Sequence, residues 1–249
     1  MPRPHDARRG ALRVRAIAIT LVALATAAFA PAQSQPLRVL FIGNSYTYVN
    51  DMPAVLKHLA AAAHEPRALE PRGILIGGYT FEHHIKDDSA GTLIERGGPW
   101  DWVVLQEQSE RPLIAPATMW RDVTLFAGAV KSAGAKVLLY ETWAREATPN
   151  LQDSLSRSYH HAAALTGATV AHVGEAWAAF RATESVTPPA HSALFQNDGS
   201  HPSPEGTYLA ACVFYATLYG KSPVGLPAEG IPAARAKEVQ ALAWKASRR

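Results

Sequence analysis

Cysteine is almost absent from this chain of 249 residues, which contains Cys212 alone. A single thiol cannot form a disulfide within the chain, and it excludes iron–sulfur clusters and zinc sites built from several cysteines. Internal repeats and low-complexity segments are missing as well. With 48% hydrophobic residues, the composition indicates a folded globular domain rather than a disordered or fibrous chain.

The apolar run near the N-terminus, residues 16–30, is too short to span a membrane, which takes about 20 residues. It follows a segment with five arginines and one acid, Asp6, and this order is typical of a secretory signal peptide. Cleavage after Ala30 would leave Pro31 at the new N-terminus, so we predict cleavage after Ala32. Residues 1–32 are then a signal peptide, which directs export by the general or the twin-arginine route. Residues 33–249 are the mature domain of a periplasmic or secreted bacterial protein.

The basic charge of the chain belongs to this leader. The whole chain has 24 Lys and Arg against 21 Asp and Glu. Removing five arginines and one aspartate leaves 19 bases and 20 acids. The predicted mature domain is close to neutral, so we expect no nucleic-acid partner and no stable membrane anchor after cleavage.

Short apolar runs alternate with helical patterns along the rest of the chain. The runs lack the alternation of half-exposed strands, which is typical of buried parallel strands. They predict strands over residues 37–42, 73–76, 101–105, 136–140 and 168–173. Capping residues and apolar spacing predict helices from residue 51 and over residues 81–96, 117–133, 150–165, 205–219 and 233–245. This alternation predicts one α/β domain, a five-stranded parallel sheet with helices on both faces.

Ligand sites of such sheets lie beyond the carboxyl ends of the strands, and Ser45 follows the first predicted strand directly. A serine there is most often a helix cap or a turn residue. A nucleophilic serine needs a base and an orienting acid, and Asp198 and His201 offer that pair, because three residues apart in a tight turn they can lie side by side. Taken alone, the Asp-x-x-His-Pro segment is explained equally well as a turn with a capping acid.

Two further clusters follow predicted strands. Gly77 and Gly78 come after the second strand, where glycine allows backbone N–H groups to approach a ligand. Gln106 and Gln108 follow the third strand, where an amide could meet a developing oxyanion. Each cluster is also common in ordinary turns and loops, so their conjunction at one end of the sheet carries more weight than any member.

The sequence Phe-Ile-Gly-Asn-Ser-Tyr-Thr over residues 41–47, together with Asp-Gly-Ser-His-Pro over residues 198–202, resembles the first and last blocks of the SGNH subgroup of the GDSL esterase and lipase superfamily. Asn44 stands where the Gly-Asp-Ser-Leu signature has aspartate. The resemblance covers essentially the whole predicted mature chain. It implies a three-layer, flavodoxin-like α/β fold and a serine esterase that uses neither metal nor cofactor.

Carried over by residue, the resemblance implies Ser45 as nucleophile, His201 as general base and Asp198 as its orienting acid. The oxyanion hole would take the N–H groups of Ser45 and Gly78. Its third donor departs from the family, because Gln108 stands where the family has asparagine. Gln106 is the less favoured alternative for that donor.

Other residues are set aside. The pairs His83-His84 and His160-His161 have no third ligand at metal spacing, so we expect solvated histidines and no metal site. Trp143, just beyond the fourth strand, could wall a substrate pocket or pack in the core. Residues 43–45 lack the glycine pattern and the lysine of phosphate loops, which disfavours nucleotide binding.

Together these features predict an exported serine esterase that hydrolyses small acyl esters through an acyl-enzyme. The substrate would be a small molecule or a glycan ester, with O-acetyl groups on carbohydrates as the first choice because of export. One alternative is a lipase or lysophospholipase of the same fold, although no long apolar insertion suggests a lid. Another is a catalytically silent member that binds carbohydrate, against which the retained triad residues argue.

Overall fold

The computed structural model describes residues 34–184 and 191–248. The predicted signal peptide, residues 1–32, lies outside the described residues, and export stays a prediction. From Ser34 onward the chain forms one compact unit. No helix in the described part of the chain is both long and apolar enough to cross a membrane.

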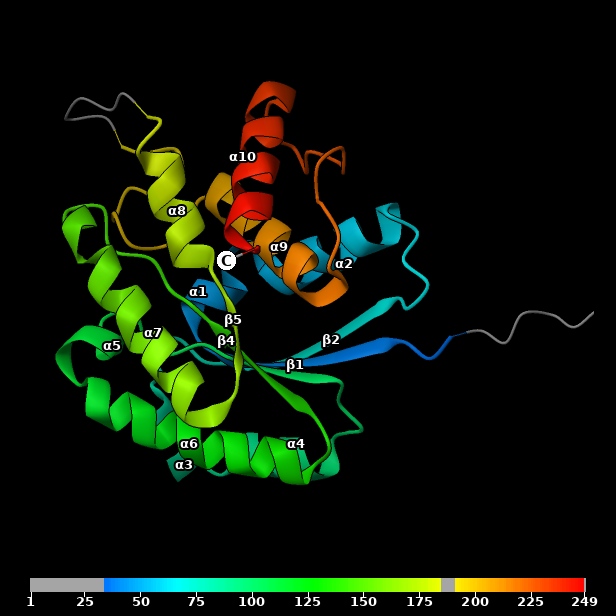
Figure 1. Ribbon diagram of the computed structural model, residues 1–249, viewed down its shortest axis with the longest axis vertical. Coiled ribbons are helices and arrows are strands. Elements are labelled where there is room, and N and C mark those ends of the chain that lie inside the picture. The colour runs from blue at the N-terminus through cyan, green and yellow to red at the C-terminus, as the bar shows by residue number, and fades with distance from the viewer. Residues whose placement is uncertain (1–33, 185–190, 249) are drawn as a thin grey trace, which may run out of the picture. The chain divides into compact units, whose positions relative to one another are not determined.

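The centre of this unit is a five-stranded parallel sheet (Figure 1). Its order is β2-β1-β3-β4-β5, the order of flavodoxin-like sheets. The strands are β1 (Leu37–Gly43), β2 (Leu69–Leu75), β3 (Trp102–Leu105), β4 (Lys136–Tyr140) and β5 (Thr169–Ala171). Every neighbouring pair is parallel. The predicted fold class is confirmed.

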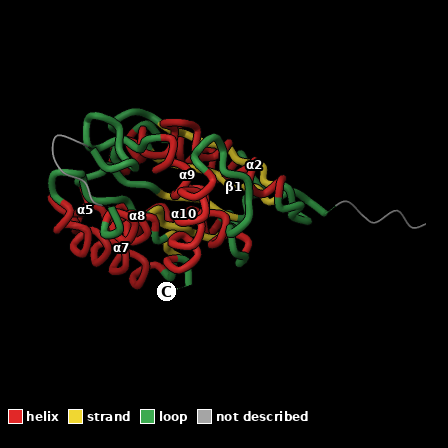
Figure 2. The backbone as a smooth tube through the Cα atoms, turned by 90° about the horizontal axis from the view of Figure 1, so that it is seen from above, coloured by secondary structure: helices red, strands yellow, loops and turns green. Residues whose placement is uncertain are grey.

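Helices cover both faces of the sheet (Figure 1). One layer contains α2 (Met52–Ala62), α8 (Val173–Arg181), α9 (Pro204–Tyr219) and α10 (Ala233–Ala246). The other contains α3 (Phe81–Lys86), α4 (Ser89–Arg96), α6 (Pro116–Ser132) and α7 (Gln152–Thr166). Figure 2 is seen from the side of the first layer, with α9 and α10 over the strands.

Alternate residues of the inner strand β1 face the two layers, as the pleat of a strand requires. Val39 and Phe41 pack into the core under α2 and α9. Leu40 and Ile42 pack into the opposite core, under α4 and α6. All four side chains are buried, which is why this strand reads as a continuous apolar run.

Several predicted boundaries are wrong. The helix expected over residues 81–96 is two helices, α3 and α4, separated by Asp88 with a left-handed φ of 57°. Strand β2 begins at Leu69, four residues before the predicted start. The prediction missed this part because β2 is an edge strand whose exposed polar residues interrupt its apolar pattern. The sequence reading also missed α8, since Gly174 in its first turn looks like a break.

Short elements complete the unit, and they lie in the connections. These are α1 (Ser45–Tyr48), η1 (Val49–Asp51), α5 (Arg111–Ile114) and η2 (Pro149–Leu151). The first of them matters most for function, because α1 begins directly after β1 and carries Ser45 at its first position.

Candidate active site

Ser45 lies at the turn between β1 and α1, beyond the carboxyl end of the inner strand β1. Asn44 caps α1, and its side-chain oxygen accepts a hydrogen bond from the Tyr46 N–H at 3.2 Å. Gly43 ends the strand where a Cβ would lie 2.7 Å from Gln106 Oε1, so a larger residue there would displace the Gln106 side chain. The turn therefore presents the Ser45 hydroxyl at the half-buried edge of the sheet.

His201 and Asp198 meet Ser45 from the loop before α9. The Ser45 hydroxyl lies 2.9 Å from His201 Nε2, and Asp198 Oδ2 lies 2.5 Å from His201 Nδ1. Because the carboxylate accepts the Nδ1 proton, Nε2 of the neutral ring is the acceptor that faces the serine. The structure thus brings together the three residues that the sequence singled out, in the order serine, histidine, aspartate.

The Asp198 carboxylate also closes its own turn. Its Oδ1 accepts the backbone N–H groups of Ser200 at 3.0 Å and His201 at 2.9 Å, and Gly199 supplies the left-handed φ of 64° that the turn needs. Burial acts to raise the pKa of Asp198, but hydrogen bonds from the His201 ring and from these two N–H groups outweigh it and lower the pKa to about 2. Asp198 is therefore a carboxylate throughout the neutral range.

An aromatic stack packs against the loop that carries Asp198 and His201. Tyr46 stacks on Trp143 at 4.3 Å between ring centroids, and Trp143 stacks on Trp177 at 3.9 Å. The Trp143 indole N–H donates to the Ser200 carbonyl at 3.0 Å, one residue before His201. Trp143 is only 1% exposed. It therefore packs in the core, and the alternative that it walls a substrate pocket is wrong. Its flat ring fits between two other rings and leaves no face for a ligand.

Gln106 belongs to the framework of the serine turn. Its Oε1 accepts the Asn44 N–H and the Thr47 hydroxyl, each at 2.9 Å. Its Nε2 donates to Asn44 Oδ1 at 2.9 Å and to the Glu107 carbonyl at 2.5 Å. An amide nitrogen has two protons, and both are engaged, so Gln106 has no donor left for an oxyanion.

Unlike Gln106, Gln108 and Gly78 keep N–H donors for an oxyanion. Gln108 Oε1 accepts the N–H groups of Glu110 and Arg111 at 3.0 and 3.2 Å, which fixes the amide plane. Its Nε2 donates to Ser109 Oγ at 3.2 Å, which leaves one proton. Gly78 has a φ of 73° in a turn joined to the serine turn by the Asn44 amide, which donates to the Tyr79 carbonyl at 2.9 Å.

Glu107 is a residue of this site that the sequence analysis did not single out. Its side chain is fully buried between the two glutamines. Its Oε1 accepts the N–H groups of Phe81, at the start of α3, and of Gln108, at 3.0 and 2.7 Å. Burial is the main cause that raises the pKa of this carboxyl to about 7. The only sequence signal was a charged residue at the end of an apolar strand.

His84 corrects the expectation of solvated histidines. It is buried in α3, and its Nε2–H donates to the Gly43 carbonyl at 2.9 Å, directly behind the serine turn. Burial lowers the pKa of its imidazole, against the opposing effect of this hydrogen bond. His84 therefore acts as a neutral hydrogen-bond donor that joins α3 to β1.

Comparison with solved structures shows which family this chain resembles. A protein from Slackia heliotrinireducens assigned to the SGNH hydrolases is 30% identical, with a TM-score of 0.62 over 74% of this chain and 99% of that protein. The esterase EstA from Pseudoalteromonas sp. is 16% identical, with a TM-score of 0.54 over 74% and 97% of the two chains. The acetyl xylan esterase AlAXEase is 14% identical, with a TM-score of 0.57 over 72% and 98%.

The sequence identities of the two esterases, 16% and 14%, are too low to indicate a shared function. These two similarities therefore support the fold alone. No family model matches the chain, and no curated protein matches it. The first similarity covers nearly the whole of the other protein at 30% identity, and it agrees with the sequence resemblance. The chain therefore belongs to the SGNH/GDSL superfamily of hydrolases.

Proposed function

We propose that this hydrolase is a serine esterase in which Ser45, His201 and Asp198 form the catalytic triad. The observation that carries the proposal is the continuous contact from Ser45 Oγ to His201 Nε2 at 2.9 Å and from His201 Nδ1 to Asp198. A serine becomes a nucleophile when a base takes its proton and a third group orients that base. Ser45 is the nucleophile, His201 is the base that takes its proton, and Asp198 is the group that orients the base.

In the proposed reaction, Ser45 Oγ bonds to the acyl carbon of an ester while its proton passes to His201 Nε2. Asp198 stabilises the imidazolium that forms. The bond to the alcohol then breaks, and His201 returns the proton to the leaving oxygen. Water attacks the acyl-enzyme in the same way, releases the acid and restores the Ser45 hydroxyl.

The negative oxygen of the intermediate needs preorganised donors. We assign this role to the backbone N–H groups of Ser45 and Gly78 and to the side chain of Gln108. Support comes from the fixed Gln108 amide plane and from the full use of the Gln106 amide elsewhere. Glutamine replaces the asparagine of the family with the same amide on a longer side chain.

We propose small acyl esters as substrates, and O-acetyl groups on carbohydrates as the first class to test. The side chains of His201 and Asp198 are 35% and 47% exposed, and an open site of this kind suits an ester displayed on a polymer. The predicted signal peptide supports export to the compartment where such polymers lie. One of the proteins with a similar fold is an acetyl xylan esterase.

The test measures hydrolysis of p-nitrophenyl esters from acetate to laurate, and acetate release from acetylated xylan. The proposal expects kcat/KM to fall as the acyl chain lengthens, and xylan to release acetate. Faster hydrolysis of the long esters would favour the lipase alternative. Binding of xylan without hydrolysis of any ester would instead identify the silent carbohydrate-binding member.

A further inference from the structure

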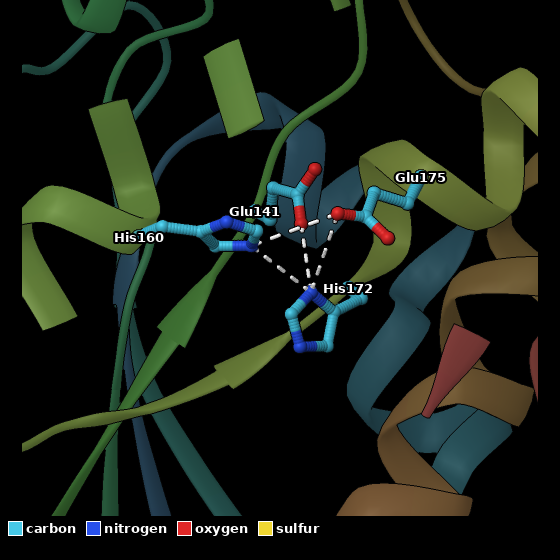
Figure 3. A group of neighbouring side chains, drawn as sticks. All are labelled: Glu141, His160, His172 and Glu175. Carbon is cyan, nitrogen blue, oxygen red and sulfur yellow. Dashed lines mark hydrogen bonds and ion pairs between the residues drawn. The ribbon is translucent and has the colours of Figure 1, made fainter. Parts of the chain in front are cut away.

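A cluster of two histidines and two glutamates lies beyond the ends of β4 and β5 (Figure 3). Glu141 follows β4, His172 follows β5, Glu175 lies in the first turn of α8, and His160 comes from α7. The sequence predicted a solvated His160 with no third ligand. His160 is exposed, as predicted, but three possible ligands from two other segments of the chain lie close to it, which sequence spacing did not indicate.

The ligand atoms of the four residues all lie within 4.8 Å of one another. His172 Nδ1 is 3.3 Å from Glu141 Oε2 and 3.4 Å from His160 Nε2. Glu175 Oε1 is 3.6 Å from His160 Nε2 and 3.9 Å from His172 Nδ1. Zinc bonds of about 2.0–2.2 Å give a tetrahedron with edges of about 3.3–3.6 Å. The spacing therefore approaches that of a tetrahedral metal site.

The hydrogen bonds and the burial of Glu141 suit it to bind a metal ion. It is fully buried, and its Oε1 accepts the Ser156 hydroxyl at 2.6 Å and the Gln152 amide at 3.1 Å. Its Oε2, on the side of His172, has no hydrogen-bond partner within the described residues. A buried carboxylate oxygen without a hydrogen bond is costly. A carboxylate held by hydrogen bonds through one oxygen is also the usual support of a metal ligand.

The backbone around Gly174 allows the cluster to form. A Cβ on Gly174 would lie 2.2 Å from the Thr142 carbonyl and 2.9 Å from Glu141 Oε1. Glycine therefore lets the first turn of α8 approach the end of β4, which brings His172 and Glu175 to Glu141. His160 is 45% exposed and lines a cavity of about 660 Å³ beside α5 and α6, so an ion can reach the cluster from solvent.

We propose that Glu141, His160, His172 and Glu175 bind one divalent transition-metal ion, with zinc the best fit. Two imidazole and two carboxylate ligands suit zinc better than calcium or magnesium, which prefer oxygen ligands alone. The ion would join α7 and α8 to the end of β4. The proposal is independent of the esterase function, because it uses no residue of the triad or of the oxyanion hole.

The test titrates zinc chloride into the purified, chelator-treated full chain by calorimetry. We expect one zinc per chain and a rise in Tm with zinc. Cobalt(II) in place of zinc should give the intense visible bands of a tetrahedral site. Ser156→Ala should weaken zinc binding about 10- to 100-fold, because it removes a hydrogen bond that orients Glu141. His160→Asn removes a ligand and should weaken binding further.

His161→Asn is the matched control, since it removes a histidine from the next, exposed position of α7 and should leave zinc binding unchanged. His160→Asn alters an exposed side chain, so it tests the site without disturbing the core as a change at Glu141 could. Absence of zinc binding by the unaltered chain would overturn the proposal. Equal loss in His160→Asn and His161→Asn would overturn it too, because it would show nonspecific binding by surface histidines.

Discussion

Replacing Glu107 with glutamine should remove a pH-dependent loss of stability. Its carboxyl is fully buried, and burial raises its pKa from 4.5 to about 7. Gln at this position keeps an Oε1 that can accept the N–H groups of Phe81 and Gln108. Glu107→Gln therefore changes the ionisation and leaves the shape and these two hydrogen bonds in place.

The magnitude follows from the two pKa values. Below pH 4.5 the carboxyl is protonated in both the folded and the unfolded chain. Between pH 4.5 and about 7 the unfolded chain releases the proton that the folded chain retains, so the free energy of unfolding falls as the pH rises. At 1.36 kcal/mol for each pKa unit, this fall amounts to about 3 kcal/mol.

Urea denaturation of both proteins over a pH series measures the effect. The free energy of unfolding of Glu107→Gln, relative to the unaltered chain, should rise by about 3 kcal/mol from about pH 4.5 to about pH 8. Glu95→Gln, at an exposed position of α4, is the control and should follow the unaltered chain. Parallel curves for Glu107→Gln and the unaltered chain would refute the reasoning.

Two further substitutions separate catalysis from stability. Gln108→Ala should lower kcat about 10²- to 10³-fold, the usual effect of losing one oxyanion donor, and should lower the free energy of unfolding by only about 1 kcal/mol, through loss of the amide oxygen that accepts the Glu110 and Arg111 N–H groups. A loss under about threefold in ester hydrolysis assays would remove Gln108 from the hole. Trp143→Ala should lower the free energy of unfolding by about 3–5 kcal/mol, because it empties a site between two stacked rings. Urea denaturation would contradict that packing account if the loss were below about 1 kcal/mol.

The sequence predicted the sheet well because buried parallel strands are continuous apolar runs. It placed the start of β2 four residues too late, because the edge position of this strand leaves polar side chains exposed. The pairing of Asp198 with His201 was accessible too, because both lie in one tight turn. Helix boundaries such as the one at Asp88 depend on a single backbone conformation, which no periodicity reveals.

Contacts between distant segments were beyond the sequence. Gln106 and Gln108 have the same side chain at the same strand end, and only the partners of their amides separate a framework residue from a free donor. The cluster around Glu141 brings together three segments between residues 141 and 175. For Trp143 the sequence left a substrate wall and a core position open, and its two stacking partners decide for the core.

The central claim is that Ser45 is the nucleophile, and hydrolysis of p-nitrophenyl acetate by the unaltered chain and by Ser45→Ala tests it most directly. Ser132→Ala, at an exposed position of α6, is the matched control. We expect Ser45→Ala to lose at least about 10³-fold in kcat/KM, since removing a triad serine abolishes acyl-enzyme formation, and Ser132→Ala to keep full activity. Equal rates for the unaltered chain and Ser45→Ala would contradict the account.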